Sequence, residues 1–398
     1  MFHVKRKTLS FFLGLAVLGV FVAGCGGAAG TRGWAAPASA GNILLVSTAP
    51  GRLDGLNAQT RQQLWRFNDF WHIEDSGARK LRGIYGQPVV SSDGLTVFFG
   101  DYNGYVYAFR PSDVKFQEFD RDSDKPKAAS FKLGGPVIGG LALGSDGVLF
   151  VTAGEVLYKL QSAQLAARIA NKDAPMDVAR LFEAAGEIWS QPLLANGNVY
   201  ISSLDGNMYA INQNTGAELW RFTGERSLAS TPALASDTLL VGGFDRRLHA
   251  VDLDTGRSKW SFEATDWVWS RPAIEGSTAY FGDFDGNVYS VNVQTGALTW
   301  ALDLDKGAVR GAPVVSRGLL IVGTEDGWFV GIEPSTHAIR WQTKLDTAVT
   351  ADLALAEDGS VLIAPTSCVS LGESEERVYY TGLDPATGEL RRALGPVC

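Results

Sequence analysis

Aromatic and arginine side chains recur at one fixed place in this sequence, three residues before a proline or its equivalent. The residues at this place are Trp34, Tyr85, Leu133, Trp189, Ala229, Trp269, Arg310 and Val349, and two residues later come Gln87, Gln191 and Arg271. Aromatic and arginine side chains are enriched where proteins bind one another, and a rigid aromatic concavity suits small ligands. Brought together by the fold, these residues predict a binding site for a peptide, a glycan or a small ligand. The alternative is that the aromatic rings pack between structural units.

The sequence shows no pattern typical of a catalytic or metal site. The four histidines, at positions 3, 72, 249 and 337, lack the spacing of metal ligands. The run from Asp283 to Asn287 resembles a calcium loop, but such a loop needs Gly at position 6 and Glu at position 12. Here Gly is fourth and Gln294 is twelfth, and similar runs at Asp205 and Asp326 indicate hairpin turns. There is no nucleophile elbow and no phosphate loop, so we expect no catalytic residue, no metal and no cofactor.

Residues 1–24 have the features of a secretory signal peptide. A basic start, Lys5-Arg6-Lys7, precedes an apolar stretch of about 14 residues, which ends in small residues. A spanning helix needs about 20 residues, so we expect cleavage. Residues 22–25, Val-Ala-Gly-Cys, resemble the lipobox of bacterial lipoproteins. The resemblance implies that Cys25 is acylated and anchors the chain through a tether of residues 25–33. The membrane would be the outer membrane of a diderm cell, or otherwise the outer face of the cytoplasmic membrane.

The net charge and the cysteine content limit which partners the protein can bind and in which cellular compartment it is expected. The formal net charge of −8 argues against a nucleic-acid-binding surface, because such a surface needs clustered positive charge. If Cys25 carries the lipid, Cys368 and Cys398 remain. An even pair of cysteines in an exported protein suggests a disulfide. The alternative is two free thiols.

The spacing of the tryptophans identifies an internal repeat. Four of them lie 40, 40 and 41 residues apart, at positions 220, 260, 300 and 341, and each comes five residues after a threonine. Trp65 stands at the same distance from Thr60. Each of these five threonines follows a proline by 23 residues, the prolines being Pro37, Pro192, Pro232, Pro272 and Pro313. Five copies that share both distances indicate repeated structural units.

Weaker copies fill the rest of the chain. One begins at Pro88 and runs to Phe116, another begins at Pro136, and the last runs from Ala351 to Leu394. A well-preserved copy predicts four strands, over residues 231–234, 239–242, 248–251 and 258–262, with turns rich in Gly, Asp and Asn. Four strands every 40 to 45 residues are typical of a propeller blade. We therefore expect an all-β fold, an eight-bladed β-propeller over residues 34–398. Its innermost strands would bring the aromatic and arginine residues to one mouth of the central channel.

Segments 210–222 and 250–262 resemble the tryptophan-docking motif of PQQ-like propellers. The resemblance implies that a glycine permits the turn and that the tryptophan packs on the next blade. The docking tryptophans are then Trp65, Trp220, Trp260, Trp300 and Trp341. A lipobox followed by eight such repeats resembles the BamB family of outer-membrane assembly lipoproteins. This implies a non-enzymatic scaffold that binds envelope or membrane proteins as a monomer within a larger assembly. The sequence departs from the motif at His337, Asp352 and Arg392, where Gly, Pro and Trp are expected.

Two other functions are compatible with the repeat. A sensor of small ligands or glycans would use the aromatic mouth. A PQQ-dependent dehydrogenase would share the repeat, and such enzymes are usually longer and carry adjacent cysteines, a calcium site of Glu and Asn, and a catalytic Asp. This chain has no Cys-Cys pair. The sequence therefore favours the scaffold over the enzyme.

Two insertions are further candidate contact surfaces. Residues 67–73 are rich in aromatic side chains and would form an apolar patch if exposed. Residues 161–186 contain two stretches with helical spacing, around Leu165 and over residues 178–182, which predict two short helices projecting from the third blade. Packing against the rim is the alternative for both insertions. The first and last repeats each hold four strands of their own, so we expect a disulfide between Cys368 and Cys398 to help close the ring.

Overall fold

The computed structural model describes residues 35–48, 52–67, 72–73, 81, 83–113, 127–345, 348–356, 358–363, 369–370 and 377–393. The predicted signal peptide and tether, with Cys25, lie outside the described residues. Trp34, Phe116, Cys368 and Cys398 lie outside them as well. The expectations placed on the signal peptide, the tether, Trp34, Cys368 and Cys398 stay predictions.

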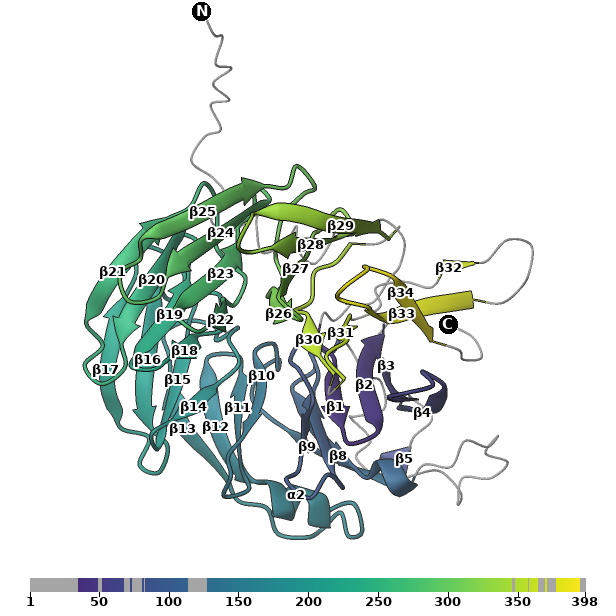
Figure 1. The fold of residues 1–398 in the computed structure, drawn as a ribbon. Helices are drawn as coiled ribbons and strands as arrows, with labels where there is room; N and C mark the ends of the chain where they lie inside the picture. Colours follow the sequence, from purple (N-terminus) through teal and green to yellow (C-terminus); the bar gives the residue numbers. More distant parts are fainter. Residues whose placement is uncertain are drawn as a thin grey trace, which may run out of the picture.

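The chain forms eight sheets arranged in a ring (Figure 1). In each blade the first strand of the repeat lies nearest the centre of the ring and the later strands of the repeat follow outward. Within the described residues six sheets have four strands and two have five. Every pairing is antiparallel except that of β5 (His72–Ile73) with β9 (Lys127–Lys132). This confirms the predicted all-β fold, an eight-bladed β-propeller.

The strands follow the order of the sequence, blade by blade. Blades 1 to 4 are β1 (Ala38–Ala40), β2 (Ile43–Thr48), β3 (Arg52–Asn57) and β4 (Gln63–Phe67); β6 (Val89–Val90), β7 (Val97–Gly100), β8 (Tyr105–Phe109) and β9 (Lys127–Lys132), with β5 (His72–Ile73) beside β9; β10 (Gly140–Leu143), β11 (Val148–Ala153), β12 (Val156–Gln161) and β13 (Val178–Glu183); and β14 (Leu193–Ala195), β15 (Asn198–Ser202), β16 (Asn207–Asn212) and β17 (Glu218–Thr223). Blades 5 to 8 are β18 (Ala233–Ala235), β19 (Thr238–Gly242), β20 (Arg247–Asp252) and β21 (Ser258–Glu263); β22 (Ala273–Glu275), β23 (Thr278–Gly282), β24 (Asn287–Asn292) and β25 (Leu298–Asp303); β26 (Val314–Ser316), β27 (Leu319–Gly323), β28 (Trp328–Glu333) and β29 (Ala338–Lys344); and β30 (Ala354–Leu355), β31 (Val361–Leu362), β33 (Arg377–Leu383) and β34 (Leu390–Ala393), with β32 (Val369–Ser370) beside β33. The helical elements described are η1 (Pro111–Asp113) and α2 (Ser162–Ala167), and no described helix is long and apolar enough to cross a membrane.

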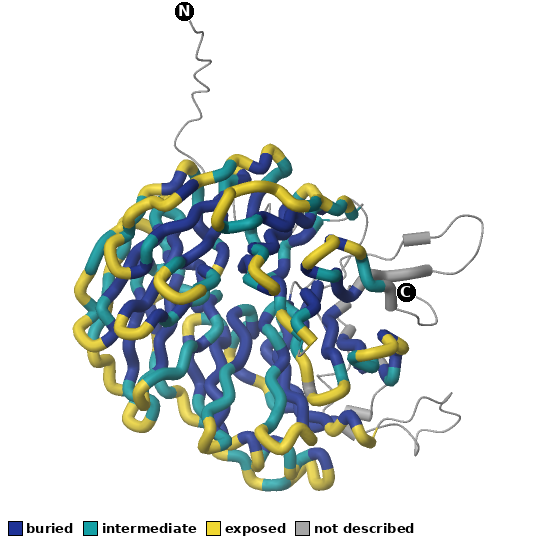
Figure 2. The backbone as a smooth tube through the Cα atoms, in the orientation of Figure 1, coloured by how far each residue is buried: buried dark blue, intermediate teal, exposed yellow. Residues whose placement is uncertain are grey.

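The hydrophobic core lies between the blades. In blades 3 to 7 the two middle strands are almost fully buried, whereas most residues of the outermost strands are exposed or half-buried (Figure 2). One cluster joins Leu248 and Ala250 of blade 5 to Phe281 and Tyr289 of blade 6. Because each blade buries its faces only against its neighbours, the ring is a single domain.

Three of the docking tryptophans contact the following blade in the same way. The indole N–H of Trp260 donates a hydrogen bond to the carbonyl of Val293 at 2.8 Å, and its ring covers Gly296. Trp220 bonds the carbonyl of Leu253, and Trp341 that of Pro385. Each of these bonds joins a side chain of one blade to the backbone of the next.

Other blades have a different residue either at the tryptophan position or at the glycine position that the tryptophan covers. In blade 3, Leu181 packs where the tryptophan is expected and lies against Gly216 of blade 4. In blade 7, His337 replaces the glycine with a φ of 61°, and its ring lies 5.3 Å from that of Trp300. At the junction of blades 8 and 1, Arg61 replaces it with a φ of 58° and donates a hydrogen bond to the hydroxyl of Ser360. The interface between blades therefore tolerates other side chains at both the tryptophan and the glycine positions.

Three expectations from the sequence need correction. Residues 178–183 form β13 rather than a helix, because they pair with β12 and complete blade 3. The predicted helix near Leu165 exists as α2, but Leu165 is buried against blades 2 and 3 instead of projecting. The fourth strand of blade 2 is β9, well beyond Phe116, so this repeat contains an insertion. The predicted apolar patch over residues 67–73 is described only in part. Phe67 is fully buried against Phe99 and Tyr107, so it packs instead of being exposed. Residues 68–71 lie outside the described residues, and the expectation for them stays a prediction.

Candidate functional site

A cavity of about 400 Å³ lies at the centre of the ring, and all eight blades contribute residues to it. Tyr85, Trp189, Trp269, Arg271 and Arg310 all line it. The structure therefore brings together the five described residues that the sequence placed at the channel mouth. Two other members of the series, Leu133 and Val349, are buried and do not line the cavity.

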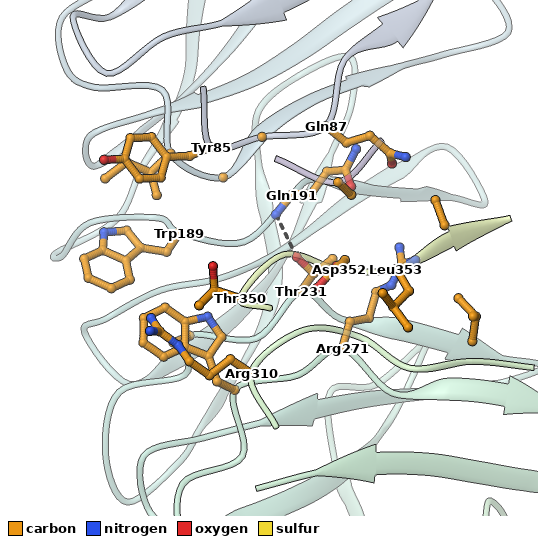
Figure 3. Close-up of a pocket in the computed structure, with 18 of the residues that line it drawn as sticks. Tyr85, Gln87, Trp189, Gln191, Thr231, Arg271, Arg310, Thr350, Asp352 and Leu353 are labelled. Atoms are coloured by element: carbon orange, nitrogen blue, oxygen red, sulfur yellow. Dashed lines mark hydrogen bonds between the residues drawn. The ribbon is translucent and has the colours of Figure 1, made fainter. Parts of the chain in front are cut away.

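Each of these five lining residues precedes an innermost strand, in the loop that arrives from the previous blade. Trp189 lies between β13 and β14, and Trp269 lies between β21 and β22. Figure 3 shows Tyr85, Trp189 and Arg310 at one end of the cavity and Gln191 and Arg271 toward the other. Residues three and one before the proline thus form two successive levels along the channel.

A buried serine between these two levels fixes their direction. The hydroxyl of Ser190 donates to the carbonyl of Ser202 and accepts from its N–H, both at 2.9 Å. Ser270 forms the same pair of bonds with Gly282. Because successive side chains of an extended segment point to opposite sides, a residue anchored in the core turns both neighbours toward the channel. A serine stands two positions before the proline in three repeats, at Ser190, Ser230 and Ser270. The expectations from the sequence did not include a role for this serine.

Trp269 is the centre of an aromatic cluster. Its ring centroid lies 5.6 Å from that of Trp189, 5.5 Å from Phe244 and 5.8 Å from Phe284, the last pair being stacked. Trp267 stacks on Phe244 at 4.8 Å. The rings of the cluster are half-buried. Part of the surface of these rings is thus buried by packing between blades, which was the alternative to a binding site, and part remains accessible.

Sequence analysis missed Phe244 and Phe284, which enter this cluster from the turns between second and third strands. Backbone hydrogen bonds hold these turns against the preceding loops, from Phe244 to Ser227 and from Phe284 to Trp267. Tyr102 occupies the same turn position in blade 2 and packs on Tyr85 at 5.6 Å. An alignment of the turns would have revealed this second aromatic series.

The two arginines of the cavity differ in their surroundings. The guanidinium of Arg310 lies 5.0 Å from the ring centroid of Trp269 and donates a hydrogen bond to Glu325 at 3.0 Å. Its side chain is only 10% exposed. Arg271 is exposed and forms no ion pair with any described residue. Arg310 is therefore held as part of the aromatic cluster, whereas the charge of Arg271 faces the cavity unpaired.

Two aspartates next to Phe244 and Phe284 in the sequence belong to hydrogen-bond networks within the protein. The buried Asp283 accepts hydrogen bonds from the hydroxyls of Thr265 at 2.6 Å and Tyr289 at 2.8 Å. Burial raises the pKa of Tyr289 to about 12. Burial opposes ionisation of Asp245, but the hydrogen bond and charge of His249, 2.8 Å away, outweigh it and lower the pKa of Asp245. Among the described residues, no group of three or more His, Cys, Asp or Glu is placed to hold a metal ion.

Comparison with known proteins agrees with this architecture. A family model described as "Outer membrane protein assembly factor BamB" matches residues 118–266, 174–308 and 249–394. The crystal structure of BamB from Moraxella catarrhalis is similar, with a TM-score of 0.59 and 17% identity over 82% of this chain and 89% of that one.

Other propellers are similar in fold alone. The computationally designed Ika8 protein has a TM-score of 0.63 and 15% identity over 92% of this chain and 97% of its own. Sqt1 from Saccharomyces cerevisiae has a TM-score of 0.64 and 11% identity over 89% and 94%. No curated protein sequence gives a significant match. Because the family model covers most of the chain, the resemblance found in the sequence is confirmed: this chain belongs to the BamB family of PQQ-like repeat propellers.

Proposed function

We propose that this chain is a non-enzymatic, lipid-anchored scaffold that binds partner proteins at the cell envelope. The observation that carries the proposal is the accessible aromatic and arginine cluster at the centre of the ring. Half-buried tryptophans in a concave site are typical of the residues that dominate the energy of protein interfaces. Membership of a family described as an assembly factor supports the same conclusion, and the protein acts as a monomer within a larger assembly.

The central cavity should be the capture site. Replacing Trp189 and Trp269 together by alanine should reduce co-purification of envelope partners at least about tenfold, because such residues each contribute about 2 kcal/mol or more. The measurement is capture by the full chain after detergent extraction, with the melting temperature of each variant determined in parallel. Leu219→Ala with Leu298→Ala is the matched control, since both leucines are about half exposed on outermost strands. Unchanged capture by a folded double tryptophan variant would refute this role of the cavity.

Anchoring should depend on Cys25. Cys25→Ser removes the acylation site and should move the exported protein from the detergent phase to the aqueous phase in a phase-partition assay. More than one acyl chain is needed for stable anchoring, so the loss should be nearly complete. Recovery of the variant in the detergent phase would show that another segment holds the membrane.

The second candidate function is a sensor of glycans or small ligands. The specific observation in its favour is the size of the cavity, about 400 Å³, which lies in the range of small-molecule sites. Saturable binding of a soluble oligosaccharide, lost in the double tryptophan variant while protein capture persists, would favour the sensor over the scaffold.

A further inference from the structure

The charged residues that line the central cavity differ in their partners. The charged lining residues are Arg271, Arg310 and Asp352. Arg310 is neutralised by Glu325, and Asp352 accepts a hydrogen bond from the backbone N–H of Ala312 at 2.8 Å. Arg271 is exposed and forms no ion pair with Asp352 or any other described residue. An acidic protein, with a net charge of −8, thus presents inside its central cavity one guanidinium that has no ion-pair partner among the described residues.

An unpaired guanidinium in a concave site is suited to a carboxylate. Its planar N–H groups match the two oxygens of a carboxylate, and the bonds are strengthened by both charges. The side chain lies in the second level of the channel, beyond the aromatic cluster (Figure 3). A ligand that reaches Arg271 from that end must therefore pass the aromatic rings, and it needs apolar as well as acidic groups.

The aromatic cluster favours a peptide over a sugar. Stacking of a sugar requires an open ring face, but the guanidinium of Arg310 lies over Trp269 at 5.0 Å and Phe284 stacks against it. The half-buried rings of Tyr85 and Trp189 also line the cavity, and they suit contact with an aromatic or aliphatic side chain. The side-chain amide of Gln87 donates one hydrogen bond to the carbonyl of Pro37, and that of Gln191 donates one to the carbonyl of Leu141. Their amide oxygens remain as acceptors for the N–H groups of a peptide.

We propose that the cavity binds an acidic peptide segment in which a carboxylate side chain lies close to an aromatic or large aliphatic one. The carboxylate pairs with Arg271, and the apolar side chain packs against Tyr85 and Trp189. This inference rests on the proposed scaffold function, since it names the partner surface that the scaffold recognises.

The proposal is tested with a library of hexapeptides whose ends are acetylated and amidated. Peptides are selected from the library by binding to the full chain, which is kept in detergent. The expected result is enrichment of Asp or Glu within two positions of Phe, Tyr, Trp or Leu. Selection of neutral or basic sequences, or no selection at all, would overturn the proposal. A neutral oligosaccharide is titrated in parallel, and its binding without peptide enrichment would overturn it in favour of a glycan site.

Titration of the best peptide then isolates the guanidinium. Arg271→Gln should weaken binding about tenfold and abolish the advantage of the Glu peptide over its Gln counterpart. Arg257→Gln is the matched control, because Arg257 is exposed on a turn of blade 5 and does not line the cavity. Arg271→Glu should restore binding of a peptide whose Glu is changed to Lys. Equal effects of Arg271→Gln and Arg257→Gln would contradict the assignment.

Failure of the peptide class and failure of the scaffold are distinguishable. If the two tryptophans are needed for envelope capture but no acidic preference is found, the peptide assignment fails and the scaffold stands. If acidic peptides bind through Arg271 but envelope capture ignores the tryptophans, the scaffold role of the cavity fails and its ligand chemistry stands.

Discussion

Replacing Trp300 by alanine should lower the free energy of unfolding by about 3–5 kcal/mol, the usual cost of removing a buried tryptophan. The side chain is only 6% exposed, and it belongs to a cluster that joins blades 6 and 7. Its ring contacts His337 of blade 7 at 5.3 Å and Tyr280 at 6.0 Å. Deleting it therefore leaves a cavity across an interface on which two blades depend.

Denaturation by guanidinium, followed by circular dichroism, measures this loss. Leu298→Ala is the control on the same strand, β25, because Leu298 is 50% exposed and its loss should change stability by no more than about 0.5 kcal/mol. If Trp300→Ala and Leu298→Ala were equally mild, the tryptophan would not hold the interface. The position would then be only a mark of the repeat.

Five blades were predictable from the sequence because their marker residues have structural tasks. The tryptophan reaches the next blade, the glycine makes room for it, and the proline precedes the innermost strand. Spacing among such residues is fixed by the size of the blade, so it is visible without any knowledge of packing. Strand bounds followed closely: the expected strand over residues 258–262 is Ser258–Glu263 in the structure.

Errors arose where these markers are missing. Val178, Leu181 and Phe182 have spacing that fits a helix, yet the strand forms because β12 offers an unpaired edge and Leu181 fills the place of the tryptophan. Blade 2 has no tryptophan in its fourth strand, so the length of its insertion was hidden and Phe116 was aligned wrongly. Pairing with distant residues decided both cases, and local pattern does not report such pairing.

Part of the candidate site was predictable from the sequence, because its residues recur with the blade as the marker residues do. Residues before the proline repeat with the blade, so the series that includes Trp189 and Trp269 could be found by alignment. Phe244 and Phe284 enter from a different turn, and their approach to Trp269 depends on how neighbouring blades are rotated. The pairing of Arg310 with Glu325, and the lack of a partner for Arg271, likewise depend on contacts between blades.

A glycine that lies under a docking tryptophan should be costly to replace, for two separable reasons. Gly296 has a φ of 70°, and a Cβ there would lie 2.6 Å from the ring of Trp260. A left-handed conformation costs a residue with a Cβ about 1–2 kcal/mol, and overpacking adds about 1–3 kcal/mol. Gly296→Ala should therefore destabilise the protein by about 2–5 kcal/mol.

Gly276 isolates the conformational part of that cost within the same blade. Its φ is 57°, but no atom lies within 4 Å of a Cβ placed on it, so Gly276→Ala should cost only about 1–2 kcal/mol. The steric part should disappear when the tryptophan is absent. In a Trp260→Ala background, Gly296→Ala should cost no more than Gly276→Ala does, and this coupling is measured by a double-mutant cycle in guanidinium. A penalty that persists without Trp260 would mean that the turn alone requires glycine. His337 occupies the corresponding turn position in blade 7 with a φ of 61°. If the turn alone required glycine, contact with Trp300 would not explain why a histidine is accepted there.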